Sequence, residues 1–241
     1  MVSAAGTLAT PGSINLKFER TRRAATIPME SDATRILSLL KARIGDRPLI
    51  FDVGSSTGAW TWQAISVFPE ACFELFEPML AVSDVYRDRL QTLLSTTTQV
   101  HSHPVAVGAA NGLVTMHVTP DAVSSTTIDW PAGTLLARQV QVEMVTLDTF
   151  VAQKRTGPPD LIKMDIQGGE LDALRGAVQT LPEVKALMLE TWLVRGYGDD
   201  TPLLPELCGF LAPFGFWLFD LGEQFRFEDG TMYALDACFV R

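Results

Sequence analysis

Cysteine is scarce in this chain of 241 residues, and its few copies lie far apart. The three cysteines, Cys72, Cys208 and Cys238, form neither an even set nor a Cys-x-x-Cys pair. This pattern excludes a disulfide framework and offers no cysteine-based zinc site. Reduced, buried thiols are typical of a cytoplasmic protein, so we expect that location.

Positive charge is also in short supply. Lys and Arg number 19 against 28 Asp and Glu, which gives a formal net charge of −9 at pH 7. A protein that binds a nucleic-acid backbone needs a basic face, and an anionic membrane surface attracts basic segments. We therefore expect neither a nucleic acid nor a membrane as partner. A homo-oligomer is compatible with these numbers.

Long apolar runs are missing as well. No stretch is long and apolar enough to span a bilayer. Residues 1–13 lack the basic start and apolar run of a signal peptide. We expect residues 1–30 to form an N-terminal tail. Residues 31–241 are expected to form one domain, because a chain of this length with 47% hydrophobic residues can build one sizeable core.

What the sequence does contain is an alternation of short apolar strands and amphipathic helices. Helices are predicted at residues 31–44, 58–68, 81–94, 170–181 and 201–213. Strands are predicted at residues 49–53, 72–76, 99–107, 160–165, 185–191, 216–221 and 232–240. The alternation indicates a doubly wound α/β fold, with a mostly parallel sheet between helices and an antiparallel strand from the C-terminal hairpin.

Residues 111–148 depart from this alternation. A strand at residues 113–118 follows an Asn-Gly turn, and a Ser/Thr-rich loop at residues 124–127 precedes Trp130. We expect this segment to be an insertion that lies over the sheet edge or over the site.

A loop with two glycines, Gly54 and Gly58, follows the first predicted strand. In a doubly wound sheet such a loop lies at the carboxyl ends of the strands, where ligands bind. The loop does not match the dinucleotide pattern Gly-x-Gly-x-x-Gly, because position 56 is serine. It formally matches the nucleophile elbow Gly-x-Ser-x-Gly, but that fold needs a histidine far downstream, and the last histidine is His117.

The remaining interpretation is a loop that binds a nucleoside without a pyrophosphate. Asp52 precedes the loop, and Glu77 stands at the end of the second strand, about 20 residues further on. An acid at that place accepts hydrogen bonds from ribose hydroxyls. An ordinary strand-to-helix turn is the alternative, since short motifs of this kind are loose.

These residues resemble a known family. The run from Asp52 to Gly58 is similar to motif I of the class I S-adenosylmethionine methyltransferases. Residues 145–150 and 160–170, together with Phe210-Leu211 and Phe214-Gly215-Phe216, resemble the FkbM family. The resemblance extends from about residue 49 to the end. Gln167 replaces the glutamate usual in the family, so a carboxylate is lost there.

The resemblance implies a seven-stranded Rossmann-like sheet and S-adenosylmethionine as methyl donor. It further implies O-methylation of a sugar or another small natural-product-type acceptor. A small molecule or carbohydrate is therefore the expected partner. The predicted cofactor contacts are Asp52, Gly54, Ser55, Gly58, Glu77, Pro78, Val107 and Asp165. The alternatives are an NAD-type oxidoreductase and a methyltransferase-like binding module without catalysis.

Two carboxylates are the predicted catalytic residues. Asp165 and Glu190 end the fourth and fifth strands of the predicted sheet, so the fold brings them to one rim. Such a pair can bind a divalent cation, Mg²⁺ or Mn²⁺, that lowers the pKa of the acceptor hydroxyl. Alternatively, one acid is the general base. Asp165 can also simply cap the next helix, and Glu190 can pair with Lys163.

Other polar and aromatic residues are secondary candidates. Lys163 interrupts an apolar strand and needs a charged partner, so we expect it to support the structure. His101 and His103 share a strand face, and we expect them near the surface. Trp130, Trp192 and Tyr197 can stack on a sugar ring or belong to the core.

Overall fold

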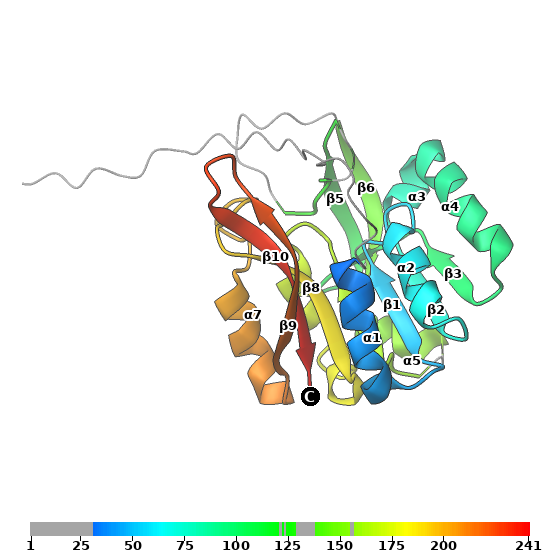
Figure 1. Ribbon diagram of the computed structural model, residues 1–241. Helices are drawn as coiled ribbons and strands as arrows, with labels where there is room; N and C mark the ends of the chain where they lie inside the picture. Colours follow the sequence, from blue (N-terminus) through cyan, green and yellow to red (C-terminus); the bar gives the residue numbers. More distant parts are fainter. Residues whose placement is uncertain (1–30, 121, 123, 129–137, 155–156) are drawn as a thin grey trace, which may run out of the picture.

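The computed structural model describes residues 31–241, except 121, 123, 129–137 and 155–156 (Figure 1). The predicted N-terminal tail and Trp130 lie outside the described residues. The division into a tail, one domain and an insertion stays a prediction.

The main sheet has seven strands in the order β3-β2-β1-β7-β8-β10-β9. The five strands from β3 to β8 are parallel to their neighbours, and β10 is antiparallel to both β8 and β9. The predicted fold class is therefore confirmed, including the antiparallel C-terminal strand. The strand bounds are β1 (Leu49–Val53), β2 (Cys72–Phe76), β3 (Val100–His103), β7 (Leu161–Met164), β8 (Ala186–Trp192), β9 (Trp217–Arg226) and β10 (Met232–Val240).

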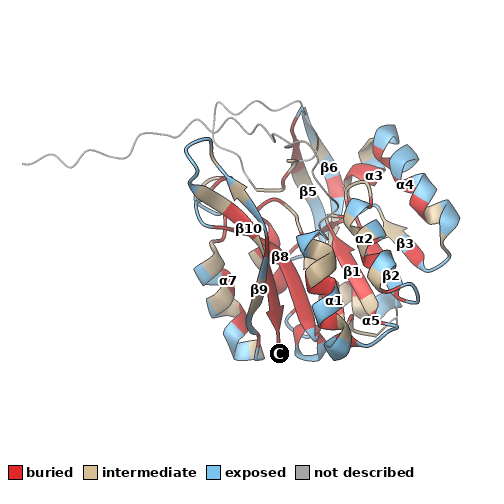
Figure 2. Cartoon of the chain, in the orientation of Figure 1, coloured by how far each residue is buried: buried red, intermediate tan, exposed pale blue. Residues whose placement is uncertain are grey.

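Two hydrophobic cores cover the two faces of this sheet. Alternate residues of a strand point to opposite faces, so Ile50 of β1 packs in one core and Phe51 in the other. The first core lies under α1 (Asp32–Ile44), α2 (Ala59–Val67), α3 (Met79–Val82) and α4 (Asp84–Thr96). The second lies under α5 (Leu147–Lys154), α6 (Glu170–Arg175) and α7 (Leu204–Leu211). The central strands are consequently buried on both faces, as Figure 2 shows.

A second, smaller sheet lies beside the first. It has the order β4-β6-β5, formed by β4 (Ala106–Val107), β5 (Gly112–Val118) and β6 (Arg138–Val145). The single strand predicted at residues 99–107 is therefore wrong, because it divides between the two sheets at Pro104. Proline has no N–H group and cannot continue a sheet ladder. Strand β6 and helix α5 were not predicted.

Several predicted helices also end elsewhere. Ser83 has an extended backbone and separates α3 from α4, where one helix at residues 81–94 was predicted. The helix predicted at residues 170–181 stops at Arg175. A short 3-10 turn, Ala212–Phe214, follows α7. No helix in the described part of the chain is both long and apolar enough to cross a membrane.

Candidate active site

A cavity of about 1260 Å³ opens at the carboxyl ends of the parallel strands. Its wall is formed by the glycine loop, the end of β2, the loop after β7, the end of β8 and the C-terminal hairpin. The predicted site residues among its lining are Gly54, Ser55, Glu77, Pro78, Val107, Asp165 and Glu190. Asp52 and Gly58 are not among the lining residues, and their contact with a cofactor stays a prediction.

Gly54 brings the glycine loop against two neighbouring strands. Its N–H donates to the carbonyl of Phe76 at 2.9 Å. Its φ is +76°, and a Cβ atom there would lie 2.0 Å from the carbonyl oxygen of Asp165. Only glycine allows this conformation and this approach together. The loop is thus wedged between β2 and the end of β7.

Ser55 adds a polar group to the cavity. The side chain lines the cavity and is 3% exposed, yet its hydroxyl has no hydrogen-bond partner among the described residues. Buried hydroxyls in folded proteins normally have a partner. A ligand in the cavity can supply that partner, so this observation fits a bound small molecule.

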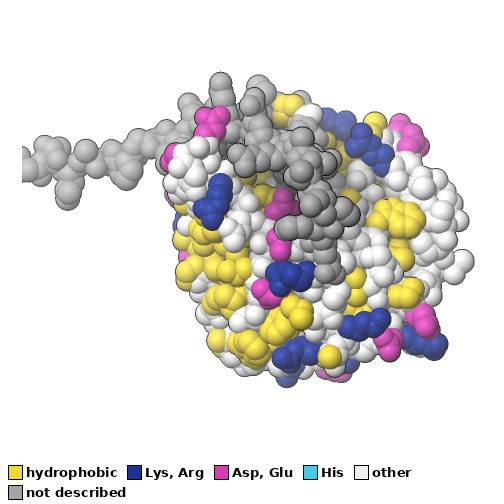
Figure 3. All heavy atoms as spheres, viewed as in Figure 1, with side chains coloured by type: hydrophobic (Ala, Val, Ile, Leu, Met, Phe, Trp, Pro, Cys, Tyr) yellow, Lys and Arg dark blue, Asp and Glu magenta, His cyan; other side chains and the backbone are white. Residues whose placement is uncertain are grey.

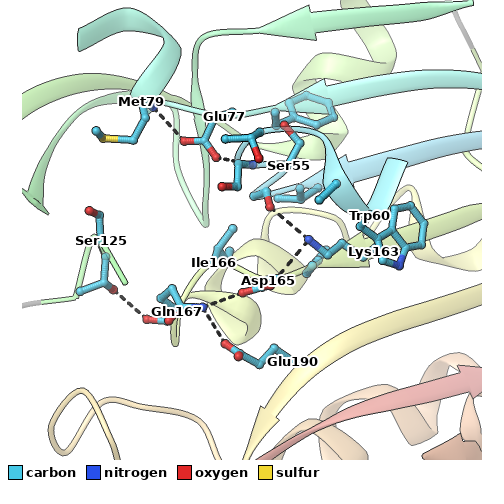
Figure 4. A pocket seen from close by; sticks show the side chains of 18 of the residues that line it. Ser55, Trp60, Glu77, Met79, Ser125, Lys163, Asp165, Ile166, Gln167 and Glu190 are labelled. Atoms are coloured by element: carbon cyan, nitrogen blue, oxygen red, sulfur yellow. Dashed lines mark hydrogen bonds and ion pairs between the residues drawn. The ribbon is translucent and has the colours of Figure 1, made fainter. Parts of the chain in front are cut away.

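Glu77 joins the glycine loop to the end of β2 (Figure 4). One carboxylate oxygen accepts from the N–H of Ser56 at 2.8 Å, and the other accepts from the N–H of Met79 at 2.9 Å. Burial raises the pKa of Glu77 to about 7, although both N–H groups favour the ionised form. Each oxygen keeps a second lone pair for a hydroxyl group of a ligand.

Asp52 and Lys163 form a buried ion pair behind the loop. The Lys163 Nζ lies 3.3 Å from Asp52 and 3.8 Å from Asp165, and it donates to the carbonyl of Gly54 at 3.1 Å. The hydroxyl of Thr61 donates to the other oxygen of Asp52. Burial opposes the charge on Lys163, but Asp52 and Asp165 together raise its pKa above the ordinary value. The predicted supporting role of Lys163 is consistent with these contacts.

Asp165 and Glu190 come together as their strand positions predict. The side-chain amide of Gln167 lies between them and donates to Asp165 at 2.6 Å and to Glu190 at 2.8 Å (Figure 4). The amide oxygen accepts from the hydroxyl of Tyr197. Gln167, which the sequence shows only as a replacement of the family's usual glutamate, therefore contacts both carboxylates of this part of the site.

The predicted Mg²⁺ or Mn²⁺ site at Asp165 and Glu190 is not supported. The amide N–H groups of Gln167 point at the carboxylate oxygens that a cation would contact. Within the described ranges, no group of three or more His, Cys, Asp or Glu side chains could hold a metal ion. The amide thus occupies the position between the carboxylates.

The aromatic residues of the cavity differ from the expected ones. Trp192 and Tyr197 belong to a buried cluster, with ring centroids 5.1 Å apart, and are not among the lining residues. The aromatic lining residues are instead Trp60, Phe76, Tyr86, Phe225 and Tyr233. Trp60 could have been found from its place just after the glycine loop. Phe225 and Tyr233 lie on the C-terminal hairpin, and no local sequence pattern indicates that this hairpin reaches the cavity.

The two neighbouring histidines lie away from this cavity. His101 is exposed, and His103 pairs with Glu74 on β2. Neither residue lines this cavity, and their interpretation as ordinary strand residues stays a prediction.

The strand order and the ligand cavity at the carboxyl ends define a class I methyltransferase fold. A sequence model of the methyltransferase FkbM domain matches residues 52–223, so the chain belongs to that family. A curated relative, Methyltransferase 1 of Beauveria bassiana (strain ARSEF 2860), is 23% identical over 151 residues, which cover 54% of this chain and 59% of the relative. The chain thus spans less than two thirds of that protein.

Solved structures agree with this fold. The methyltransferase FkbM of Methylobacillus flagellatus KT aligns with a TM-score of 0.51 at 20% identity, over 80% of this chain and 44% of that one. Magnesium protoporphyrin IX methyltransferase of Synechocystis PCC 6803, solved with bound SAH, aligns with a TM-score of 0.50 at 13% identity, over 87% and 81% of the two chains. At these identities the likeness concerns the fold.

Proposed function

We propose that this chain is an S-adenosylmethionine-dependent O-methyltransferase that acts on a hydroxyl group of a sugar or another small natural-product-type molecule. The observation that carries the proposal is the position of Glu77. Its carboxylate is held by the loop that follows β1 and faces the cavity at the end of β2. A ribose binds at this place in doubly wound sheets. The SAH bound to the Synechocystis methyltransferase is consistent with this choice of ligand.

The residues of the cavity fit such a donor. The Glu77 carboxylate can accept hydrogen bonds from both ribose hydroxyls, and the Ser55 hydroxyl of the glycine loop has no partner among the described residues. The Gly-x-Gly-x-x-Gly pattern, which brings a backbone close to a pyrophosphate, is absent. These features favour a nucleoside sulfonium over the NAD of the alternative oxidoreductase.

The acceptor side of the cavity carries three carboxylates. Glu190 of β8 is the register partner of Asp236 on β10, and Asp165 follows β7 level with Glu190. All three side chains line the cavity. Carboxylates accept hydrogen bonds from hydroxyl groups and repel anions. We therefore propose a neutral, hydroxyl-rich acceptor rather than a phosphorylated or nucleic-acid one.

Methyl transfer needs the acceptor oxygen in line with the donor, and it releases the hydroxyl proton. S-adenosylmethionine, when bound, supplies the electrophilic methyl group. Asp165 lies at the rim with its side chain 35% exposed, so it can reach the hydroxyl and take its proton. Glu190 is 5% exposed and held by Gln167, so we assign it to orienting the acceptor.

Calorimetric titration with S-adenosylhomocysteine and with NAD tests the donor assignment. The wild-type chain should bind S-adenosylhomocysteine, and NAD should give no comparable heat. Glu77→Ala should weaken binding of S-adenosylhomocysteine about tenfold to a hundredfold, since the hydrogen bonds to two ribose hydroxyls are lost. The exposed Glu70 provides a matched control, and Glu70→Ala should leave the dissociation constant unchanged. An unchanged constant in Glu77→Ala would show that the ribose assignment is wrong.

Turnover with an isotopically labelled methyl donor tests the reaction. A panel of neutral sugars and polyols, with their phosphorylated counterparts, should yield O-methylated products from the neutral members only. Asp165→Asn should abolish product while S-adenosylhomocysteine still binds. Donor binding without product from any hydroxyl acceptor would favour the silent binding module.

A further inference from the structure

Gln167 has an unusual backbone for its residue type. Its φ is +58°, in the left-handed region that non-glycine residues rarely adopt. Its carbonyl oxygen accepts from the hydroxyl of Thr126 at 2.8 Å, which ties the residue to the segment after β5. Such strain persists only where surrounding contacts hold it. The chain thus places this side chain at a defined point of the site.

Every polar group of the side chain is engaged. The two amide hydrogens have separate acceptors, Asp165 and Glu190. The amide oxygen accepts from Tyr197, whose hydroxyl donates the hydrogen. Tyr197 is 1% exposed and its ring packs on Trp192, so it cannot easily turn away. Because the carboxylate oxygens accept hydrogen bonds and a hydroxyl can donate one, the amide nitrogen faces the two carboxylates and the amide oxygen faces Tyr197.

The place of the amide has an electrostatic consequence. Two carboxylates within reach of one nitrogen atom repel each other unless a donor or a cation lies between them. A divalent cation would need the same carboxylate oxygens, because Mg²⁺ and Mn²⁺ prefer oxygen ligands. The N–H groups of Gln167 already contact one oxygen of each carboxylate from the position between them. The neutral amide of Gln167 therefore occupies the place between the two carboxylates that a divalent cation would need.

We propose that Gln167 is a positioning residue that takes the place of a divalent cation between Asp165 and Glu190 and holds both carboxylates toward the cavity. The site then works without a bound metal. The inference rests on the proposed function in one respect, the role of the two carboxylates in binding and deprotonating the acceptor. The bridge itself follows from the contacts of the described residues.

Titration of the metal-free chain with Mn²⁺ tests this proposal. Gln167→Gly removes the amide, and a φ of +58° suits glycine, so the backbone should keep its shape. This variant should bind Mn²⁺ at least tenfold more tightly than the wild-type chain. The added affinity should disappear in Gln167→Gly combined with Asp165→Asn. Gln167→Glu, which adds a third carboxylate, should bind Mn²⁺ more tightly still.

Three results would overturn the proposal. The first is Mn²⁺ binding by the wild-type chain that Asp165→Asn removes. The second is a Gln167→Gly variant with no gain in affinity. The third is a gain in Gln167→Gly that persists when Asp165→Asn is added, because the ion would then bind elsewhere. Binding of S-adenosylhomocysteine is measured in Gln167→Gly and Gln167→Glu and should stay within about threefold of wild type, because neither substitution changes Glu77 or the glycine loop. If no form of the chain binds it, the proposed function fails while the Mn²⁺ comparison still stands.

Discussion

At the scale of single residues, Gly54 carries the most severe steric constraint of the site. A methyl group at this position would overlap the carbonyl of Asp165, and the positive φ adds strain. Asp165 itself lines the cavity, so a shift of its backbone moves a predicted catalytic residue. The glycine therefore couples the donor loop to the acceptor side.

We expect Gly54→Ala to lower the free energy of unfolding by about 3 kcal/mol or more and to weaken binding of S-adenosylhomocysteine. Gly215→Ala is the matched control, because Gly215 has a φ of +84° with no atom near its missing Cβ. The control should cost only about 1–2 kcal/mol and leave binding unchanged. Urea unfolding and calorimetry measure both effects. Equal losses in the two variants would contradict the steric argument.

Glu170 is the other residue whose burial has a measurable consequence. It is fully buried and accepts from the N–H groups of Ile166 and Gly168 through one oxygen. Its second oxygen has no partner among the described residues. Burial raises the pKa of Glu170 to about 7, so the folded state favours the protonated form. Its contribution to stability is therefore complete below about pH 4.5 and is lost as the pH rises through 7.

Glu170→Gln should remove this pH dependence, because the amide keeps the accepting oxygen and carries no charge. The wild-type chain should lose up to about 3 kcal/mol between pH 4.5 and pH 8 from this group, and the variant should not. Unfolding curves at several pH values measure the difference. The exposed Glu183 serves as control, and Glu183→Gln should follow the wild-type curve. Parallel curves for wild type and Glu170→Gln would contradict the prediction.

At the scale of elements, the segment after β5 is joined to the loop after β7. Thr126 is 2% exposed and pairs through its backbone with His117 of β5. Its hydroxyl donates to the carbonyl of Gln167 and accepts from the N–H of Ile128. This is the part of residues 111–148 that reaches the site, and Trp130 lies outside the described residues. This hydroxyl joins the segment after β5 to the loop after β7.

Thr126→Val should cost about 1–3 kcal/mol of stability, since the side chain keeps its shape and leaves a buried carbonyl without its donor. Acceptor turnover should fall, while the affinity for S-adenosylhomocysteine should not change. Thr115→Val is the control, because its hydroxyl contacts Gln141 at the surface of the same small sheet. The control should change stability by less than about 0.5 kcal/mol. A loss of donor affinity in Thr126→Val would place this segment in the donor site instead.

At the scale of the whole molecule, helices pack on both faces of the main sheet through two hydrophobic cores, and the cavity opens at the carboxyl ends of the parallel strands. The outer strand β9 exposes Trp217, Leu218 and Leu221. Hydrophobic and charged side chains lie close together on the face of the molecule shown in Figure 3. Arg35 of α1 binds both Asp220 and the carbonyl of Leu221. The edge of the sheet is thus partly covered by the first helix.

A ligand that binds the folded chain alone stabilises it as a whole. At a hundred times its dissociation constant, S-adenosylhomocysteine should add about 2.7 kcal/mol to the free energy of unfolding. For a chain of this size the melting temperature should rise by roughly 5–10 °C. NAD at the same concentration should leave it unchanged. A thermal shift of equal size with both ligands would remove the distinction on which the donor assignment rests.

The local features of this protein follow from its sequence. The apolar runs, the glycine loop and the acids at the strand ends are each set by a few neighbouring residues, so they predict the fold class and the approach of Asp165 and Glu190. A local signal is not sufficient where the surrounding sequence is irregular. Residues 138–145 alternate polar and apolar side chains like a strand, but the Ser/Thr-rich stretch before them favours a loop, so the sequence does not predict β6.

Only the tertiary structure decided how the site is completed. Gln167, Tyr197 and Thr126 are distant in sequence, and their contacts depend on the register of strands and on loops that cross between elements. Asp165, Glu190 and Asp236 lie side by side because β10 pairs with β8, and no local sequence pattern determines this strand order. Hydrogen bonds of this kind require an approach within about 3 Å, and a periodic pattern of hydrophobic residues specifies a face of an element but not such a distance.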